Sequence, residues 1–163
     1  MWRHRVSNWW RRRQVRPENL PDWGVGYLNR YDPPSGSTPI EEVRLVVFDT
    51  ETTGLDIERS QLLTLGAVAV TGGTICLQDS FEQAICRAEI APASVRIHGL
   101  VPQDLRRGSS EEEAVAAFVE FVGSGVLVAH HAAFDVAMLE RAMAGVPLLN
   151  YALDTEVLAR RLE

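Results

Sequence analysis

Residues 45–55 read L-V-V-F-D-T-E-T-T-G-L. The segment opens with four apolar residues, a run that is short and rich in β-branched side chains, which favours a buried strand over a core helix. Asp49 and Glu51 follow at a spacing of two, and side chains at that spacing in a strand point to the same face. The pattern therefore predicts two carboxylates side by side at the end of a buried strand.

Two ionised carboxylates at that distance repel each other, so at least one tends to take up a proton. A divalent cation relieves the repulsion, because Mg²⁺ and Mn²⁺ prefer oxygen ligands and use few protein carboxylates. Thr52, Thr53 and Gly54 follow as a turn that brings backbone N–H groups and hydroxyls near the same point. A lone D-x-E is more often an acidic turn that closes a strand, but the whole string favours a metal site.

A second motif lies downstream, where residues 130–139 read H-H-A-A-F-D-V-A-M-L. The short apolar run before it, residues 126–129, predicts a strand, and the apolar spacing after it predicts a helix that ends near Gly145. Asp135 falls in the first turn of that helix. An acid in this position can simply stabilise the positive end of the helix dipole and needs no function.

Together the two motifs resemble the DEDD family of 3′–5′ exonucleases, which includes the proofreading epsilon subunit of bacterial DNA polymerase III. F-D-T-E-T-T-G-L is similar to the first exonuclease motif of that family, and H-H-A-A-F-D is similar to the second, usually H-N-A-x-F-D. The resemblance implies an α/β, RNase H-like fold, with a mixed sheet and flanking helices. It also implies a metal-dependent exonuclease in which Asp49, Glu51 and Asp135 are catalytic and bind two Mg²⁺ or Mn²⁺ ions.

The same resemblance implies a set of substrate-binding residues. These would be Thr52, Gly54, Leu55, His98, His131 and Phe134. Thr52, Gly54 and Leu55 would bracket the terminal nucleotide of the nucleic acid. His98 lies in an I-H-G-L segment that lines the substrate cleft in the family, although a histidine before a glycine is often a half-exposed turn residue. His131 stands where the family usually has Asn, which predicts a changed contact.

The remaining elements follow from local patterns. Residues 62–70 and 74–78 predict two strands joined by a Gly72-Gly73 turn, and residues 80–85 either extend this hairpin or form another short strand. Ser110, with Glu113 three residues on, predicts a capping box that opens a helix. Asp154 fits the N-cap of a last helix running through residue 162.

Residues 1–39 are expected to form a basic, tryptophan-rich arm with a Pro/Gly linker, ahead of an exonuclease domain at residues 40–163. Residues 1–40 hold seven Arg against three acids, a net charge of +4, whereas residues 41–163 hold nine Arg against 19 acids, a net charge of −10. Such an arm fits three uses: contact with nucleic acid, contact with an anionic membrane surface, or packing of its tryptophans on the domain.

The third motif of the family, a histidine followed five residues later by an aspartate, has no suitably placed match. This histidine would be the general base of the reaction. We therefore expect an exonuclease domain that is incomplete at its C-terminus and lacks its C-terminal helices. If these residues were the whole protein, weak or absent catalysis would follow.

The expected reaction is hydrolysis of phosphodiester bonds at a single-stranded or frayed 3′ end, by a two-metal mechanism, on DNA in proofreading or repair. An RNA-trimming nuclease remains open, as does a catalytically silent module that binds a 3′ end or a polymerase partner. The chain has no apolar run of about 18 residues, so no transmembrane segment is expected. Without a secretory signal, and with two cysteines that match no metal spacing, the expected location is the cytoplasm.

Overall fold

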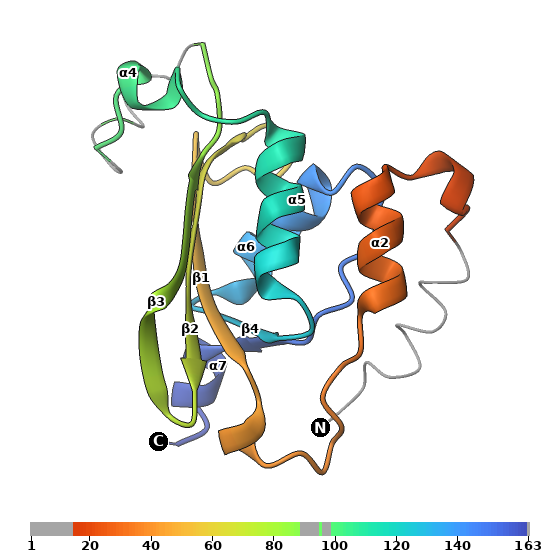
Figure 1. The fold of residues 1–163 in the computed structure, drawn as a ribbon. Helices are drawn as coiled ribbons and strands as arrows, with labels where there is room; N and C mark the ends of the chain where they lie inside the picture. The colour runs from red at the N-terminus through yellow and green to blue at the C-terminus, as the bar shows by residue number, and fades with distance from the viewer. Residues whose placement is uncertain (1–14, 89–94, 96–98, 163) are drawn as a thin grey trace.

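The computed structural model describes residues 15–88, 95 and 99–162 (Figure 1). At its centre lies a sheet with the strand order β3-β2-β1-β4-β5. The strands are β1 (Leu45–Thr52), β2 (Leu62–Thr71), β3 (Thr74–Ala84), β4 (Val126–Ala129) and β5 (Ala152–Asp154). β1 pairs antiparallel with β2 and parallel with β4, so the sheet is mixed, as the sequence predicts.

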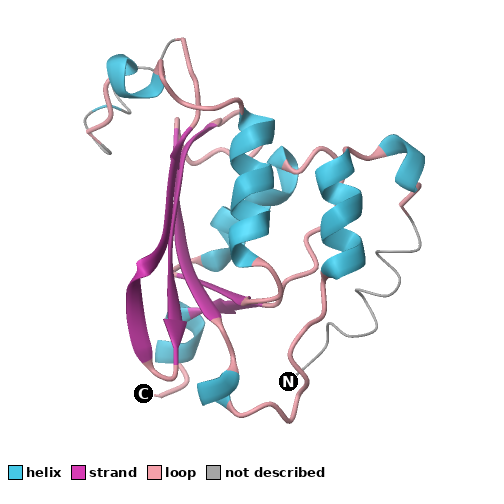
Figure 2. Ribbon diagram, viewed as in Figure 1, coloured by secondary structure: helices cyan, strands magenta, loops and turns pink. Residues whose placement is uncertain are grey.

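α5 (Glu111–Val122) and α6 (Ala132–Ala142) cover one face of this sheet, as Figure 2 shows. The other described helices are α2 (Asp22–Arg30), α4 (Pro102–Leu105) and α7 (Thr155–Ala159), with short 3-10 turns η1 (Pro17–Asn19) and η2 (Ile40–Glu42). α5 and α6 lie beside the sheet, and α2 packs outside them against α5 (Figure 1). Within the described ranges, no helix has the length and apolar character needed to cross a membrane.

β1 alternates between the two faces of the sheet. Val46, Phe48 and Thr50 are buried, whereas Val47 and Asp49 between them are exposed. The Phe48 ring packs against Phe118 of α5, with 5.7 Å between the ring centroids. The period of two therefore turns the apolar side chains toward the helices and leaves the first acidic residue on the open face.

The hairpin and the capping box follow the sequence prediction. Gly72 and Gly73 both have positive φ, 58° and 73°, which suits the tight turn between β2 and β3. Residues 80–85 extend the hairpin, because β3 runs unbroken from Thr74 to Ala84. Ser110 Oγ accepts from the N–H of Glu113, and the Ser110 N–H donates to Glu113 Oε2, so both halves of the capping box of α5 are present.

Part of the predicted arm packs against α5 and the segment before β5. The sequence predicted no helix before residue 40, yet residues 22–30 form α2, and Tyr27 and Tyr31 join the hydrophobic core. The Tyr27 hydroxyl accepts from the N–H of Leu149 at 2.7 Å and donates to Asn150 Oδ1 at 2.6 Å. Residues 15–39 therefore contribute to the core, and a domain boundary at residue 39 stays a prediction.

Two smaller differences lie at the C-terminal end of the described chain. The strand β5, which the sequence did not predict, pairs with β4 in parallel. α7 begins after Asp154 as expected but ends at Ala159 instead of running to residue 162. Residues 160–162 continue beyond the helix as hydrogen-bonded turns.

Candidate functional site

β1 carries Asp49 and Glu51, the two acidic residues of the first motif. Asp49 is exposed and lies opposite Gly66 of β2, and Glu51 is half-buried opposite Thr64. A Cβ atom built on Gly66 would meet no other atom within 4 Å. The surface beside Asp49 is therefore open, with room for a ligand next to its carboxylate.

Asp135 approaches this part of β1 from α6. It lies in the first turn of the helix and is only 5% exposed. Its Oδ1 atom accepts from the backbone N–H of Thr50 at 3.0 Å and from the Thr50 hydroxyl at 2.7 Å. Since Thr50 stands between Asp49 and Glu51 in the chain, these two hydrogen bonds bring the second motif to the middle of the first.

The electrostatic state of Asp135 is unusual for a carboxyl group. Burial raises its pKa above the ordinary value; the hydrogen bond from the Thr50 hydroxyl opposes this shift, and the negative charge of Asp49 adds to it. A desolvated carboxyl beside a second carboxylate is the arrangement that a divalent cation stabilises. The donor set at this point is therefore chemically suited to a metal ion.

The described residues do not, however, bring three ligands together. Within residues 15–88, 95 and 99–162, no three His, Cys, Asp or Glu side chains are gathered closely enough to hold a metal ion. The charge of Asp49 acts on the carboxyl of Asp135 and raises its pKa, but Glu51 completes no three-ligand group with these two residues. Binding of metal by all three residues stays a prediction.

Thr50 is a residue of this site that the sequence reasoning missed. It is 8% exposed and is one of few buried polar side chains in the described chain. A signal for it was present, because the strand period places residue 50 on the buried face, where a hydroxyl needs a hydrogen-bond partner. The identity of that partner, 85 positions away, could not be read from a local pattern.

The end of β1 and the loop after it hold three of the six predicted substrate-binding residues, Thr52, Gly54 and Leu55. The Thr52 hydroxyl donates to the carbonyl of Gly54 at 2.6 Å. Thr53 and Gln61 close the loop through two hydrogen bonds, one to the Gln61 carbonyl at 3.0 Å and one to the Thr53 hydroxyl at 2.9 Å. Leu55 is 87% exposed. The loop, whose two ends are hydrogen-bonded to each other, thus exposes the apolar side chain of Leu55 near the end of β1.

The two histidines of the second motif are held by α7. His131 has a left-handed conformation, with φ of 56°, and its Nδ1 atom lies 2.8 Å from Glu156 Oε2. His130 Nδ1 lies 3.1 Å from the hydroxyl of Thr155. Phe134 is half-buried and packs against the hydrophobic core. The predicted residue His98 lies outside the described residues.

Asp154 joins the start of α7 to the start of α6. Desolvation opposes ionisation of this carboxyl, but the backbone N–H groups of Glu156, Val157, His131 and Ala132 together hold its pKa below the ordinary value. The first two of these contacts confirm the predicted N-cap of α7. The other two fix the turn from which α6 carries Asp135 toward β1.

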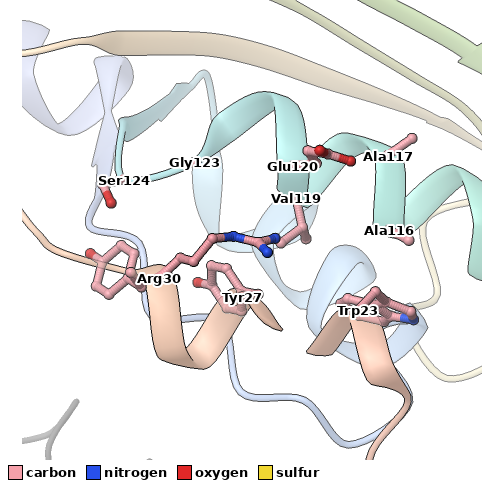
Figure 3. Close-up of a pocket in the computed structure, with 10 residues that line it drawn as sticks. Trp23, Tyr27, Arg30, Ala116, Ala117, Val119, Glu120, Gly123 and Ser124 are labelled. Carbon is pink, nitrogen blue, oxygen red and sulfur yellow. The ribbon is translucent and has the colours of Figure 1, made fainter. Parts of the chain in front are cut away.

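A separate cavity of about 270 Å³ lies between α2 and α5 (Figure 3). Trp23 and Tyr27 line it from α2, and Val119 and Glu120 line it from α5. The predicted site residues do not line this cavity, so the concave surface between these helices is distinct from the surface around Asp49.

Comparison with known proteins identifies relatives on both sequence and structure. A sequence model described as exonuclease (RNase_T) matches residues 46–162. The DNA polymerase III PolC-type protein of Clostridium perfringens is 37% identical over 120 residues, which covers 72% of this chain and 8% of that protein. The DNA polymerase III subunit epsilon-like protein of Rhodobacter capsulatus is 32% identical over 126 residues, covering 75% and 18%. The chain thus spans less than a fifth of the length of these relatives.

Solved structures share the fold. The crystal structure of E. coli exonuclease I in complex with a dT13 oligonucleotide matches with a TM-score of 0.62 at 14% identity, covering 74% of this chain and 29% of that chain. Apo exonuclease I matches with a TM-score of 0.61 at 15% identity, covering 73% and 30%. The mixed sheet with flanking helices is therefore an RNase H-like exonuclease fold, which confirms the fold expected from the two motifs.

Proposed function

Because this chain belongs to the exonuclease family, we propose that it is a 3′–5′ exonuclease that hydrolyses phosphodiester bonds at the 3′ ends of nucleic acids. The observation that carries the proposal is the double hydrogen bond from Thr50 to Asp135. It brings Asp135 of the second motif next to Asp49 and Glu51 of the first, although the two motifs lie far apart in the chain. The surface of β1 beside Asp49 is open.

Asp49, Glu51 and Asp135 are the proposed ligands of two Mg²⁺ or Mn²⁺ ions. Such ions, when bound, would activate a water molecule and stabilise the charge that develops on the phosphate. The raised pKa of Asp135, with the charge of Asp49 beside it, supports a cation at this point. The carboxylates contribute oxygen ligands only, which suits Mg²⁺ and Mn²⁺ better than softer metals.

Other residues of the chain would orient these ligands and the substrate. Thr50 fixes one oxygen of Asp135, which limits the rotation of the carboxylate. Leu55 offers an exposed apolar surface against which the terminal base can pack. Apolar packing and stacking tolerate any base, so we expect little dependence on the sequence at the 3′ end.

DNA is the proposed substrate, and a replicative polymerase is the proposed partner. The named relatives are DNA polymerase III proteins, and exonuclease I of the same fold is known in complex with a dT13 oligonucleotide. A catalytically silent 3′-end-binding module is the second candidate. It is favoured by the lack of a gathered three-ligand group in the described chain.

The test is cleavage of a 5′-labelled single strand by the purified full-length protein, with Mn²⁺ or with a chelator. We expect stepwise shortening from the 3′ end with Mn²⁺ only, and its loss in Asp49→Asn. Asp32→Asn is the matched control, because Asp32 is exposed and its described hydrogen bond involves the backbone N–H. An Asp49→Asn variant as active as the wild type would remove the assignment.

Two further results separate the alternatives. Binding of the strand without metal-dependent cleavage would favour the silent module. Equal or faster trimming of an RNA strand of the same sequence would point to an RNA-trimming nuclease, because contact with the 2′-hydroxyl decides between DNA and RNA.

A further inference from the structure

α6, which contacts β1 through Asp135, also contacts the loop after β1, through Arg141. Arg141 lies six positions after Asp135, about 9 Å further along the helix. Its Nη1 atom donates to the carbonyl oxygen of Ile57, and its Nη2 atom donates to that of Ser60. A guanidinium presents its donors in a planar fork that can reach two acceptors at once, whereas an ammonium is a single point charge.

The part of the loop that Arg141 contacts is a short helical turn. The Asp56 carbonyl accepts from Arg59 at 3.1 Å and from Ser60 at 2.7 Å, and Asp56 Oδ1 accepts from the N–H of Glu58 at 3.0 Å. The carbonyl groups of Ile57 and Ser60 are left at the end of this turn, where an arginine is a favourable partner. Arg141 therefore holds a preformed turn, and the loop cannot swing away from α6 without breaking both hydrogen bonds.

We infer that Arg141 is a positioning residue for the loop that carries Leu55. α6 is tied to β1 at Asp135 and to the loop at Arg141, so one rigid helix sets the distance between the proposed catalytic carboxylates and the apolar contact for the terminal base. The inference rests on the proposed function. It assigns Arg141 to the placement of the 3′ end and not to the reaction itself.

Three variants test this role. Arg141→Met removes the donors and keeps much of the side-chain stem. Arg141→Lys keeps the charge but cannot reproduce the fork. Arg59→Met is the matched control, because Arg59 belongs to the same loop, its side chain is 88% exposed and its guanidinium lies 3.7 Å from Asp56.

Amide hydrogen exchange is the first measurement, and it does not depend on activity. In both Arg141 variants the amides of residues 53–61 should exchange about tenfold faster than in the wild type, while those of residues 132–139 should keep their wild-type rates. Arg59→Met should leave both segments unchanged. Unchanged exchange in Arg141→Met would overturn the inference, whether or not the protein cleaves nucleic acid.

Steady-state cleavage of the single strand is the second measurement. A positioning role predicts that KM rises about tenfold in both Arg141 variants while kcat stays within about twofold, because the terminal nucleotide is held less well but the carboxylates are intact. Faster loop exchange with an unchanged KM would refute the link between the loop and the substrate. A wild-type full-length protein that neither binds nor cleaves the strand would instead refute the proposed function.

Discussion

At the scale of single residues, the hydroxyl of Thr50 is what distinguishes Asp135 from an ordinary helix-capping acid. We predict that Thr50→Val weakens Mn²⁺ binding about tenfold, because loss of a hydrogen bond that orients a ligand typically lowers metal affinity by this amount. The midpoint of thermal stabilisation in an Mn²⁺ titration measures the effect. Thr50→Ser keeps the hydroxyl and should titrate as the wild type does. A Thr50→Val midpoint equal to that of the wild type would contradict the prediction.

The raised pKa of Asp135 predicts a pH dependence of stability. The folded protein binds this proton more tightly than the unfolded chain does, so the carboxyl contributes stability below its ordinary pKa of 3.8, and that contribution is lost as pH rises through the raised value. In metal-free buffer at pH 7, Asp135→Asn should therefore be more stable than the wild type by about 1 kcal/mol. Urea denaturation at several pH values should show this advantage shrinking as the pH falls.

Asp154 supplies a control, because its pKa is shifted in the direction opposite to that of Asp135. Its folded-state pKa is lowered, so its carboxylate contributes stability above the ordinary pKa, and this contribution is lost as pH falls through the lowered value. Asp154→Asn should consequently be less stable than the wild type at pH 7. If both variants shifted stability in the same direction at that pH, the two assignments could not both hold.

The placement of Asp49 on the open face of β1 could be predicted from the sequence, because it depends on the period of a single strand. The contact between Asp135 and Thr50 could not, since it joins residues 85 positions apart and is set by how α6 packs on the sheet. The hydrogen bonds of Arg141 are of the same kind, 81 and 84 positions apart. Local patterns therefore indicate which residues are candidates, and tertiary packing decides which of them meet.

At the scale of whole elements, α5 is predicted by local sequence patterns, whereas α2 depends on tertiary packing. α5 has a capping box and apolar residues at helical spacing, so its sequence alone predicts it. α2 contains Gly24 and Gly26 in nine residues, and glycine in a helix interior costs up to about 1 kcal/mol relative to alanine. Its helical state depends on packing, which explains why no local pattern predicts it.

The two glycines of α2 should respond to substitution in opposite ways. A Cβ at Gly24 would lie 2.4 Å from Val146 Cγ2, a buried side chain, whereas a Cβ at Gly26 would lie 3.2 Å from the mobile end of Arg30. Gly24→Ala should therefore lower the free energy of unfolding by about 2 kcal/mol, and Gly26→Ala should raise it slightly through helix propensity. Urea denaturation of the two variants measures both effects. Equal effects in both variants would show that α2 does not pack closely at Gly24.

At the scale of the whole molecule, α2 is joined to segments that lie far from it in sequence. Tyr27 bonds to residues 149 and 150, and the Asn150 side chain donates in turn to the carbonyl groups of Gly123 and Gly125. These groups lie at the turn between α5 and β4 and just before β5. The packing of α2 thus stabilises the N-terminal ends of β4 and β5. The C-terminal ends of these two strands lead into α6 and α7.

This arrangement predicts that residues 15–39 are required for stability, although composition suggests an appended arm. A chain shortened to residues 40–163 loses Tyr27 and Tyr31, each 5% exposed, and uncovers the surfaces that they bury. We expect it to lose more than about 3 kcal/mol of unfolding free energy relative to a chain of residues 15–163, and we expect the longer chain to unfold in a single transition. Urea denaturation of both chains, followed by circular dichroism, measures this difference. Tryptophan fluorescence serves for the longer chain alone, because every Trp of the sequence lies before residue 40. Equal stability of the two chains would instead place an independent domain at residue 40, with α2 as a dispensable attachment.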